Sequence, residues 1–139
     1  MVEVFKLHHR LAADTTVVHE TQSLLLLLAN DARYPWLILV PKINDVRELY
    51  ELKGDDWQEF HRVSSILGAE LMTLFQGDKL NVAALGNEVP QLHVHHVVRF
   101  KTDYAWPAPI WGKGEAITYT PNELATRLNL VQESLSFCQ

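Results

Sequence analysis

Two histidines separated by one residue, His93 and His95, have the clearest chemical potential in this 139-residue sequence. They lie in the run QLHVHHVV (residues 91–98), where alternating apolar and polar residues predict a β-strand. Because strand side chains alternate between faces, Gln91, His93 and His95 are expected on one face and His96 on the other. Imidazoles at this spacing lie about 7 Å apart and can hold one phosphate or metal ion. Since the ordinary pKa of histidine is about 6.5, one neutral ring can act as a nucleophile while the other donates a hydrogen bond.

The segments around this run are expected to form a sheet that positions it. Residues 23–29 and 36–40 are continuous apolar runs separated by turn-forming residues, which predicts a hydrophobic hairpin. Residues 80–85 predict a third strand that leads through a Gly-containing loop at 86–90 into a fourth strand over 91–101.

Helices are predicted between and after these strand pairs. Capping residues and apolar spacing predict a short helix over 44–54 and a longer one over 55–77. The apolar stripe of the longer helix comprises Trp57, Phe60, Val63, Leu67, Leu71 and Leu74. Residues 104–112 are rich in proline and aromatic residues and predict irregular structure. A final helix is predicted after Thr120, with Pro121 in its first turn.

The order of these elements indicates the fold class. Residues 1–20 are compatible with either a helix or an edge strand. A hairpin, then helices, then a strand pair and a last helix favour an α+β fold with an antiparallel sheet. A chain of this length is expected to form a single domain, residues 1–139.

The composition narrows the classes of function. A content of 47% hydrophobic and 21% charged residues is typical of a globular protein. The net charge of −5 argues against a nucleic-acid partner, since such binding needs clustered Lys and Arg, but leaves a nucleotide-sized anion open. Cys138 is the only cysteine, which excludes an intrachain disulfide. The apolar run at 24–29 is far shorter than the roughly 20 residues that cross a bilayer, so no membrane partner and a cytoplasmic location are expected.

The segment from Asn81 to His95 resembles the signature strand pair of the histidine triad (HIT) family. That family has the motif His-φ-His-φ-His-φ-φ, with φ apolar, after an Asn-bearing strand and a short Gly-containing loop. In this sequence Gln91 stands at the first histidine position, His93 at the middle one and His95 at the third. The extra His96 falls on an apolar position of the motif.

Two earlier segments strengthen the resemblance. Asn30 and Asp31 end the first apolar run where the family has an Asn or Asp that contacts the ribose of a nucleotide. VPKIN at residues 40–44 is similar to the family segment Val/Ile-Pro-Lys-x-His, with Asn44 at the histidine position. Proteins of this family are expected to have an antiparallel sheet of about five strands packed with a long helix, here followed by a C-terminal helix.

The resemblance covers roughly residues 20–103, which implies a core at about 20–103 and a C-terminal extension at about 104–139. The tryptophan-rich segment and the last helix resemble a bacterial subgroup of HIT proteins, here with Gln in place of the first triad histidine. The resemblance also implies a homodimer.

By this resemblance His93 is the nucleophile that attacks the α-phosphorus of a nucleoside phosphate derivative and forms a nucleotidyl-histidine. His95 would donate to the phosphoryl oxygens, and Gln91 would keep an orienting role. Such chemistry needs positioning and charge neutralisation, so neither metal nor cofactor is implied. The substrate-binding residues are expected to be Asn30, Asp31, Asn81 and Asn87.

Three residues depart from the family pattern or oppose its chemistry. Gln91 and Asn44 replace titratable side chains by amides that cannot become cationic. Glu88 precedes the motif, and a carboxylate 4 Å from a phosphate would repel it by about 1 to 4 kcal/mol. Its side chain is therefore expected to point to solvent.

Three functions remain open at this level. The first is a nucleotidyl hydrolase or transferase, and the second is a nucleotide-binding protein of low turnover on the same fold. The third is a metal site built on His93 and His95, for which the sequence offers no evident third ligand.

Overall fold

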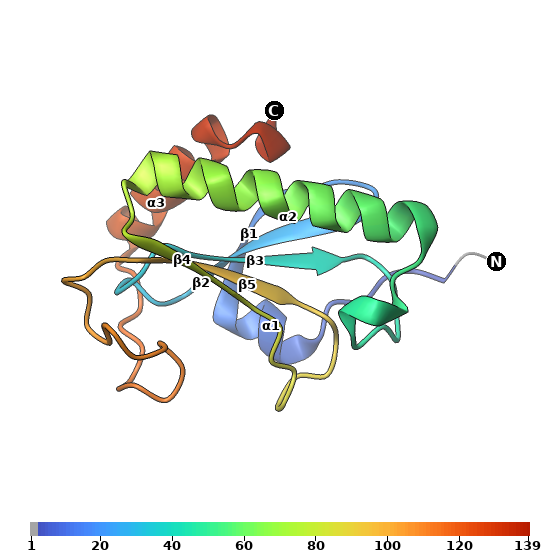
Figure 1. Cartoon of the computed structure of the whole chain (residues 1–139), viewed down its shortest axis with the longest axis horizontal. Helices are drawn as coiled ribbons and strands as arrows, with labels where there is room; N and C mark the ends of the chain where they lie inside the picture. The colour runs from blue at the N-terminus through green and yellow to red at the C-terminus, as the bar shows by residue number, and fades with distance from the viewer. Residues whose placement is uncertain (1–2) are drawn as a thin grey trace.

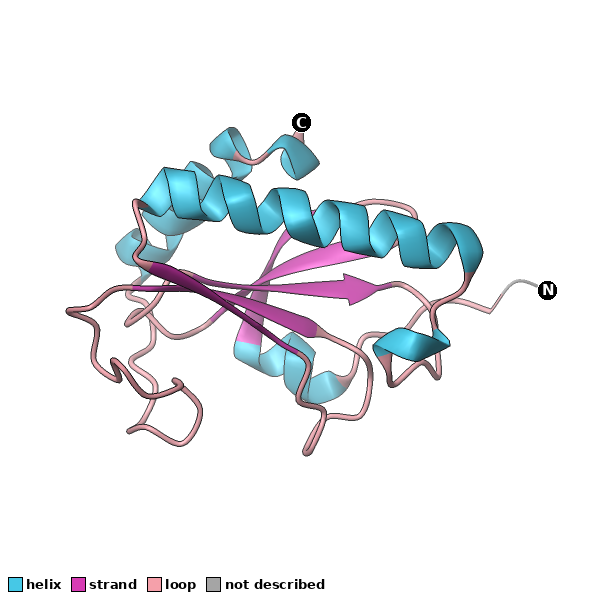
Figure 2. Ribbon diagram, viewed as in Figure 1, coloured by secondary structure: helices cyan, strands magenta, loops and turns pink. Residues whose placement is uncertain are grey.

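The computed structural model describes residues 3–139 and confirms the α+β fold that the sequence predicts. Its strands are β1 (Thr15–Glu20), β2 (Leu24–Ala29), β3 (Trp36–Pro41), β4 (Lys79–Ala83) and β5 (Val94–Arg99). Its α-helices are α1 (His9–Asp14), α2 (Gly54–Phe75) and α3 (Pro121–Ser134). The strands form one antiparallel sheet in the order β1-β2-β3-β5-β4. Helix α2 crosses one face of the sheet, and α1 lies against the opposite face (Figure 1, Figure 2).

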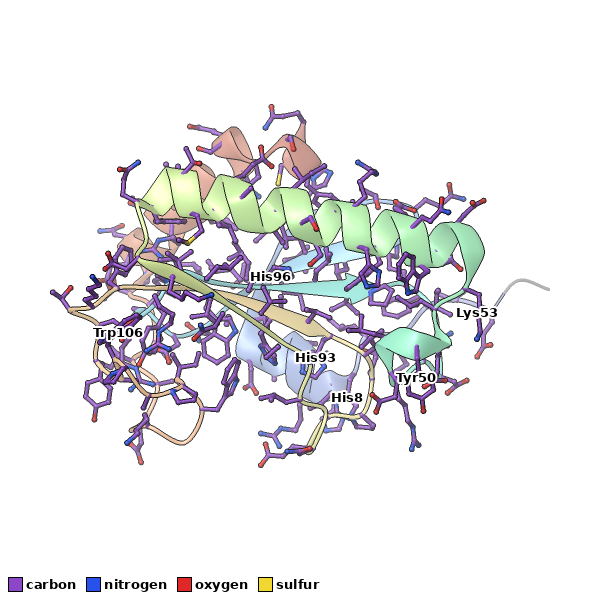
Figure 3. All side chains as sticks on the ribbon, viewed as in Figure 1. His8, Tyr50, Lys53, His93, His96 and Trp106 are labelled. Atoms are coloured by element: carbon purple, nitrogen blue, oxygen red, sulfur yellow. The ribbon has the colours of Figure 1, made fainter. Side chains whose placement is uncertain are left out.

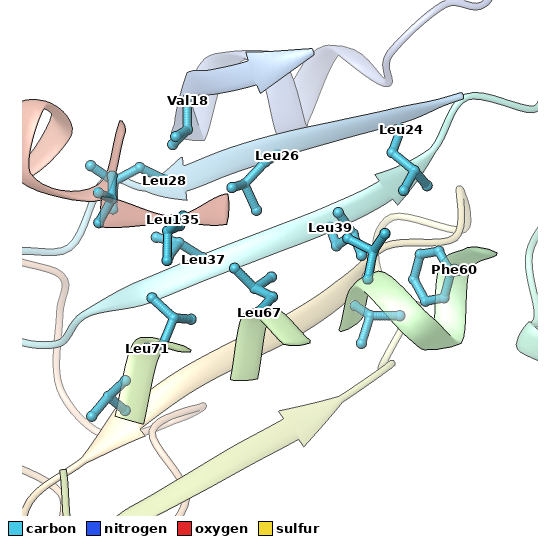
Figure 4. Packing of buried hydrophobic residues seen from close by; sticks show 14 of the residues in the cluster. Val18, Leu24, Leu26, Leu28, Leu37, Leu39, Phe60, Leu67, Leu71 and Leu135 are labelled. Carbon is cyan, nitrogen blue, oxygen red and sulfur yellow. The ribbon is translucent and has the colours of Figure 1, made fainter. Parts of the chain in front are cut away.

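Strand β2 is buried along its whole length because the hairpin of β2 and β3 has hydrophobic layers on both faces. Leu24, Leu26 and Leu28 enter the main core beneath α2 (Figure 4). The odd-numbered residues of β2 enter a second core together with Leu11 of α1. The continuous apolar run therefore forms a strand that is buried on both faces, as predicted.

Helix α2 packs on the sheet through most of the predicted stripe, with Phe60, Val63, Leu67 and Leu71 buried. Trp57 is an exception: it is 46% exposed and stacks on the ring of His61. Gly68 allows a close approach to β4, since a Cβ atom there would lie 2.6 Å from Cδ2 of Leu80. The sheet face beneath the helix is therefore tightly covered.

The prediction of a short helix over residues 44–54 is wrong. Only one 3-10 turn, Leu49–Glu51, forms in this segment. The backbone of Asp45 has a left-handed φ of 64°, and the carbonyl of Val46 accepts a hydrogen bond from the Leu92 amide at 2.8 Å. These features hold the segment as a connection, and α2 begins at the residue predicted to end the short helix.

The structure settles the ambiguous N-terminal region and confirms the predicted C-terminal helix. Residues 9–20, ambiguous from the sequence, form α1 followed by the edge strand β1, while residues 1–2 lie outside the described part. The final helix α3 is as predicted, with the Thr120 side chain accepting a hydrogen bond from the Glu123 amide. Over residues 3–139, none of the helices has the length and apolar character needed to span a bilayer.

Candidate active site

A pocket of about 670 Å³ lies on the sheet face opposite α2. Its walls come from α1, parts of β2 and β3, the loop at residues 85–89 and the segment at residues 111–118. His93 and His95 both line it. Figure 3 shows His93 on this side of the sheet together with His8, while His96 lies on the side of α2. The expected division of the histidines between two faces is thus present.

His93 lies just before β5 and is 7% exposed. Its Nδ1 lies 2.7 Å from the main-chain carbonyl oxygen of Gln91. Because a carbonyl can only accept, Nδ1 carries the proton, and Nε2 is left with the free lone pair. Burial lowers the pKa of His93, and the nearby His8 lowers it further, against the opposing effect of the Gln91 carbonyl. A neutral ring with a nucleophilic Nε2 follows.

His95 has the opposite arrangement of its ring nitrogens. The indole Nε1 of Trp36 donates to Nδ1 of His95 at 3.0 Å. Nδ1 therefore has no proton, so in the neutral ring Nε2 bears the hydrogen and is a donor. Burial lowers the pKa of His95 to about 3, with smaller contributions from His93 and His96. His95 is consequently a neutral hydrogen-bond donor and not a proton donor at neutral pH.

The two rings are held together by aromatic neighbours. The ring centroids of His93 and His95 lie 4.9 Å apart in an edge arrangement. Trp36 and Trp111 pack on His95 at 5.7 Å and 5.2 Å. This packing fixes the orientation of the His95 ring beside His93.

Both ring nitrogens of His96 form hydrogen bonds within the fold. Its Nδ1 donates to the Val94 carbonyl at 3.1 Å, and its Nε2 accepts from the Ser64 hydroxyl of α2 at 2.7 Å. Burial lowers its pKa to about 4. One ring nitrogen therefore binds the main chain of β5, and the other links β5 to α2.

Asn30 and Asp31, predicted to meet the ribose, both line the pocket. Asp31 is 2% exposed, and its carboxylate accepts from the Nε and Nη2 atoms of Arg33 at 3.0 and 2.9 Å. The Asn30 side-chain oxygen accepts from the Tyr119 amide at 3.3 Å. Both polar side chains are therefore oriented before any ligand enters.

The loop before β5 forms the mouth of the pocket, where Asn87 and Glu88 lie. Gly86 in this loop has a φ of 72°, a conformation that disfavours other residues. The Glu88 side chain is 78% exposed, and its carboxylate lies 3.3 Å from Nη1 of Arg10. The expectation that Glu88 faces solvent is met, with Arg10 as its partner.

Two of the predicted site residues lie outside the pocket wall. The Asn81 oxygen accepts from Nη1 of Arg99 at 2.8 Å. The Gln91 amide binds the main chain of the N-terminal segment, to Lys6 and His8, at 2.9 and 2.8 Å. The contact of Gln91 with the His93 ring is made by its main-chain carbonyl, which any residue at this position would supply.

The sequence did not reveal the hydrogen-bond partners of His95 and Asp31, which are Trp36 and Arg33. In the sequence Trp36 is only the first residue of an apolar run, but in the structure β3 pairs with β5 so that Ile38 is opposite His95. Trp36 is then the diagonal neighbour of His95, which only the strand register reveals. Arg33 follows Asp31 by two residues, and this spacing is the one local signal that could have found a partner.

The donor set does not suggest a metal centre. Among residues 3–139 no group of three His, Cys, Asp or Glu side chains is arranged to hold an ion. His93 and His95 direct Nδ1 to a carbonyl and an indole, and they gain no third ligand.

Comparison with known proteins identifies the family of this chain. A family model described as the HIT domain matches residues 10–102. The chain therefore belongs to the HIT family. No curated protein matches it.

Several solved structures are similar over nearly the whole chain. A histidine triad protein from Marinobacter aquaeolei VT8 is 47% identical with a TM-score of 0.94, covering 99% of this chain and 100% of its own. One from Sinorhizobium meliloti 1021 is 37% identical with a TM-score of 0.90, covering 94% and 97%. One from Bradyrhizobium japonicum is 34% identical with a TM-score of 0.91, covering 96% and 99%.

Proposed function

We propose that this protein is a nucleotide-binding hydrolase or transferase that cleaves a nucleoside monophosphate from a phosphoramidate or anhydride partner through a covalent nucleotidyl-His93 intermediate. The observation that carries the proposal is the complementary pair of imidazoles in the pocket. Nε2 of His93 keeps its lone pair, while Nε2 of His95 bears a hydrogen, with the rings 4.9 Å apart. Membership of the HIT family supports the nucleotide as substrate.

In the first step, Nε2 of His93 attacks the α-phosphorus and forms a P–N bond as the bond to the leaving group breaks. The leaving group takes its proton from water, since the lowered pKa of His95 keeps that ring in its neutral form, which is not an effective acid. The His93 ring becomes positively charged, and the Gln91 carbonyl stabilises this charge through Nδ1. Burial thus keeps the nucleophile neutral, and the carbonyl offsets the cost of the charge that develops.

In the second step, water or another acceptor attacks the phosphorus and the P–N bond to His93 breaks. The product is the nucleoside monophosphate when water attacks, or the nucleotidylated acceptor otherwise; the attacking group loses its proton to solvent, and His93 returns to its neutral form. His95 donates to a phosphoryl oxygen in both steps, where the negative charge increases. Its tautomer, fixed by Trp36, is the one that this role needs.

The rest of the pocket would hold the nucleoside. Asp31 would accept from the ribose hydroxyls, with its carboxylate oriented by Arg33. Asn30 and Asn87 line the same pocket and would complete the polar contacts. Asn81 lies outside the pocket wall, and its side-chain oxygen accepts from Arg99, so the pocket geometry gives its predicted contact with substrate no support.

A nucleotide-binding protein with little turnover is the second candidate. Its support is that Asp14 and Glu88 line the pocket beside the single guanidinium of Arg10, so that little positive charge is available to stabilise a transition state. The substitution of Gln91 for a histidine also removes one titratable group. The homodimer, the cytoplasmic location and the bacterial subgroup with Gln at this position remain predictions.

The test is AMP release from adenosine 5′-phosphoramidate and from adenylyl anhydrides, measured for the wild type and for His93→Ala. Loss of the nucleophile is expected to lower the rate at least about a thousandfold while AMP still binds. His61→Ala, on the outer surface of α2, controls for loss of any histidine. Binding without turnover on every leaving group would replace this proposal by the second candidate.

A further inference from the structure

The N-terminal segment is held along the protein by the side-chain amides of Asn44 and Gln91. Asn44 accepts from the Lys6 amide at 3.1 Å and donates to the Val4 carbonyl at 2.9 Å. Gln91 donates to the Lys6 carbonyl at 2.9 Å and accepts from the His8 amide at 2.8 Å. Two amides therefore bind successive main-chain groups of the segment, as a neighbouring strand would. We call Asn44 and Gln91 the amide clamp.

The alternate side chains of the same segment fix its depth. Phe5 and Leu7 pack on the second core, the apolar layer that contains Leu11 and β2. The segment is thus held by its backbone on one side and by apolar contacts on the other. These contacts fix the path of the segment up to the start of α1.

A short chain of hydrogen bonds leads from the clamp to the pocket. The Gln91 side chain binds the His8 amide, and Nδ1 of His8 accepts from the Arg10 amide at 3.1 Å. The His8 carbonyl accepts from the Ala12 amide at 3.0 Å, which closes the first turn of α1. Arg10 then lines the pocket, and its guanidinium reaches Glu88 at the mouth.

Arg10 has an electrostatic task that no other residue of the pocket wall can perform. Among the described residues that line this pocket, it is the only lysine or arginine. Three carboxylates line the same pocket, and burial lowers the pKa of both histidines so that they are neutral at pH 7. A phosphate entering this pocket would meet no other full positive charge.

The pairing of Arg10 with Glu88 leaves the guanidinium available. The two side chains are 51% and 78% exposed, and exposed pairs of this kind are weak. A phosphate can be bound by two parallel N–H groups of an arginine, which is a stronger contact. Exchange of Glu88 for a phosphate therefore needs no change in the fold.

We propose that the amide clamp positions Arg10 as the phosphate-binding cation of the pocket, so that the site selects nucleoside phosphates over nucleosides. The inference rests on the proposed function, because it takes a nucleoside phosphate as the ligand. It gives Asn44 and Gln91 a role that the histidines of the family pattern cannot fill, since a neutral imidazole has one donor and one acceptor on opposite sides of its ring. Asn44 and Gln91 are positioning residues, and Arg10 contacts the substrate.

The test is calorimetric binding of AMP and of adenosine to the intact protein and its variants. Arg10→Gln is expected to weaken AMP binding about ten- to a hundredfold and to leave adenosine binding unchanged. Arg10→Lys should recover part of the loss because it keeps the charge without the fork. Lys101→Gln, which removes the same charge at an exposed position outside the pocket wall, should bind AMP as the wild type does.

The role of the clamp is tested by a double-mutant cycle. Gln91→Ala keeps the carbonyl that binds His93 but should weaken AMP binding, with faster hydrogen exchange of the His8 amide. The double variant Arg10→Gln/Gln91→Ala should be no weaker than Arg10→Gln alone. Additive losses, or equal losses for AMP and adenosine, would show that the clamp does not act through Arg10.

The outcomes separate the two proposals. If the wild type binds no AMP, both the proposed function and this inference fail. If the wild type binds AMP and Arg10→Gln binds it equally well, only this inference fails. If Gln91→Ala does not fold, Asn44→Ala removes the other half of the clamp. Hydrogen exchange of the Lys6 amide and AMP binding in that variant then test the role of the clamp in the same way.

Discussion

His95 and His96 are adjacent in β5, and the difference between them shows what makes a buried histidine chemically useful. Burial lowers the pKa of both, to about 3 and about 4. His96 uses both ring nitrogens for structure, on Val94 and Ser64. His95 uses only Nδ1, which accepts from Trp36, and leaves Nε2 to the pocket. Both residues are buried, so they differ in Nε2, which is bound to Ser64 in His96 and faces the pocket in His95.

The contrast follows from strand geometry and from what covers each face. Adjacent side chains of a strand point to opposite faces. The face of His96 is covered by α2, which brings Ser64 within hydrogen-bond distance. The face of His95 borders the pocket, where the rings of Trp36 and Trp111 pack on the imidazole.

The largest expected effect on this contrast comes from His95→Ala. Loss of a donor aimed at a developing negative charge should lower kcat about a hundred- to a thousandfold. AMP binding should change much less, because the effect lies mainly in the transition state. Steady-state kinetics on a phosphoramidate measure it. A variant that keeps wild-type kcat would mean that His95 is only a packing residue.

His96→Ala should give the opposite pattern. Removal of a fully buried ring, with loss of the Ser64 contact, should lower the free energy of unfolding by about 2 to 4 kcal/mol. The folded variant should keep kcat within a few fold. Urea unfolding and kinetics on the same sample measure both, with Ser64→Ala as the milder control. A large loss of kcat in stable protein would contradict a structural role.

Trp36→Phe is expected to have a smaller effect. The ring volume is largely kept, but His95 loses the indole donor that fixes its tautomer. Some molecules would then carry the proton on Nδ1 and present the wrong nitrogen to the substrate. We expect kcat to fall roughly two- to tenfold, in line with the loss of one hydrogen bond. NMR of the His95 ring nitrogens would show the mixed tautomer, and a single unchanged tautomer would exclude this explanation.

The smallest effect concerns pH. Burial lowers the pKa of His93 below its ordinary value of 6.5, and in the proposed mechanism the neutral ring is the nucleophile. Between pH 7 and pH 6, kcat/KM should therefore fall by less than the roughly threefold loss given by a group that titrates at 6.5. The acid limb of the profile should lie below pH 6.5. An acid limb at or above this value would contradict a buried neutral nucleophile.

Much of the fold could be predicted because its signals are local. The leucine run of β2, the stripe of α2 and the Thr120 cap of α3 each specify an element by neighbouring residues. The segment at residues 44–54 could not, because its helical spacing is overridden by a distant contact with Leu92.

The site divides in the same way. The spacing of His93 and His95 predicts a shared face, and the resemblance predicts that Asp31 lies nearby. The proton positions depend on the Gln91 carbonyl and on Trp36, one fixed by a turn before the strand and the other by strand register. Neither relation can be read from residue spacing.

The most direct measurement is the intact mass of the protein during turnover of adenosine 5′-phosphoramidate, quenched in alkali because a P–N bond to histidine is acid-labile. The account predicts a species heavier by one adenylyl group in the wild type, mapped to His93 and absent from His93→Ala. Slower formation of the same adduct is expected in His95→Ala. Turnover that persists in His93→Ala, or an adduct on another residue, would contradict the account.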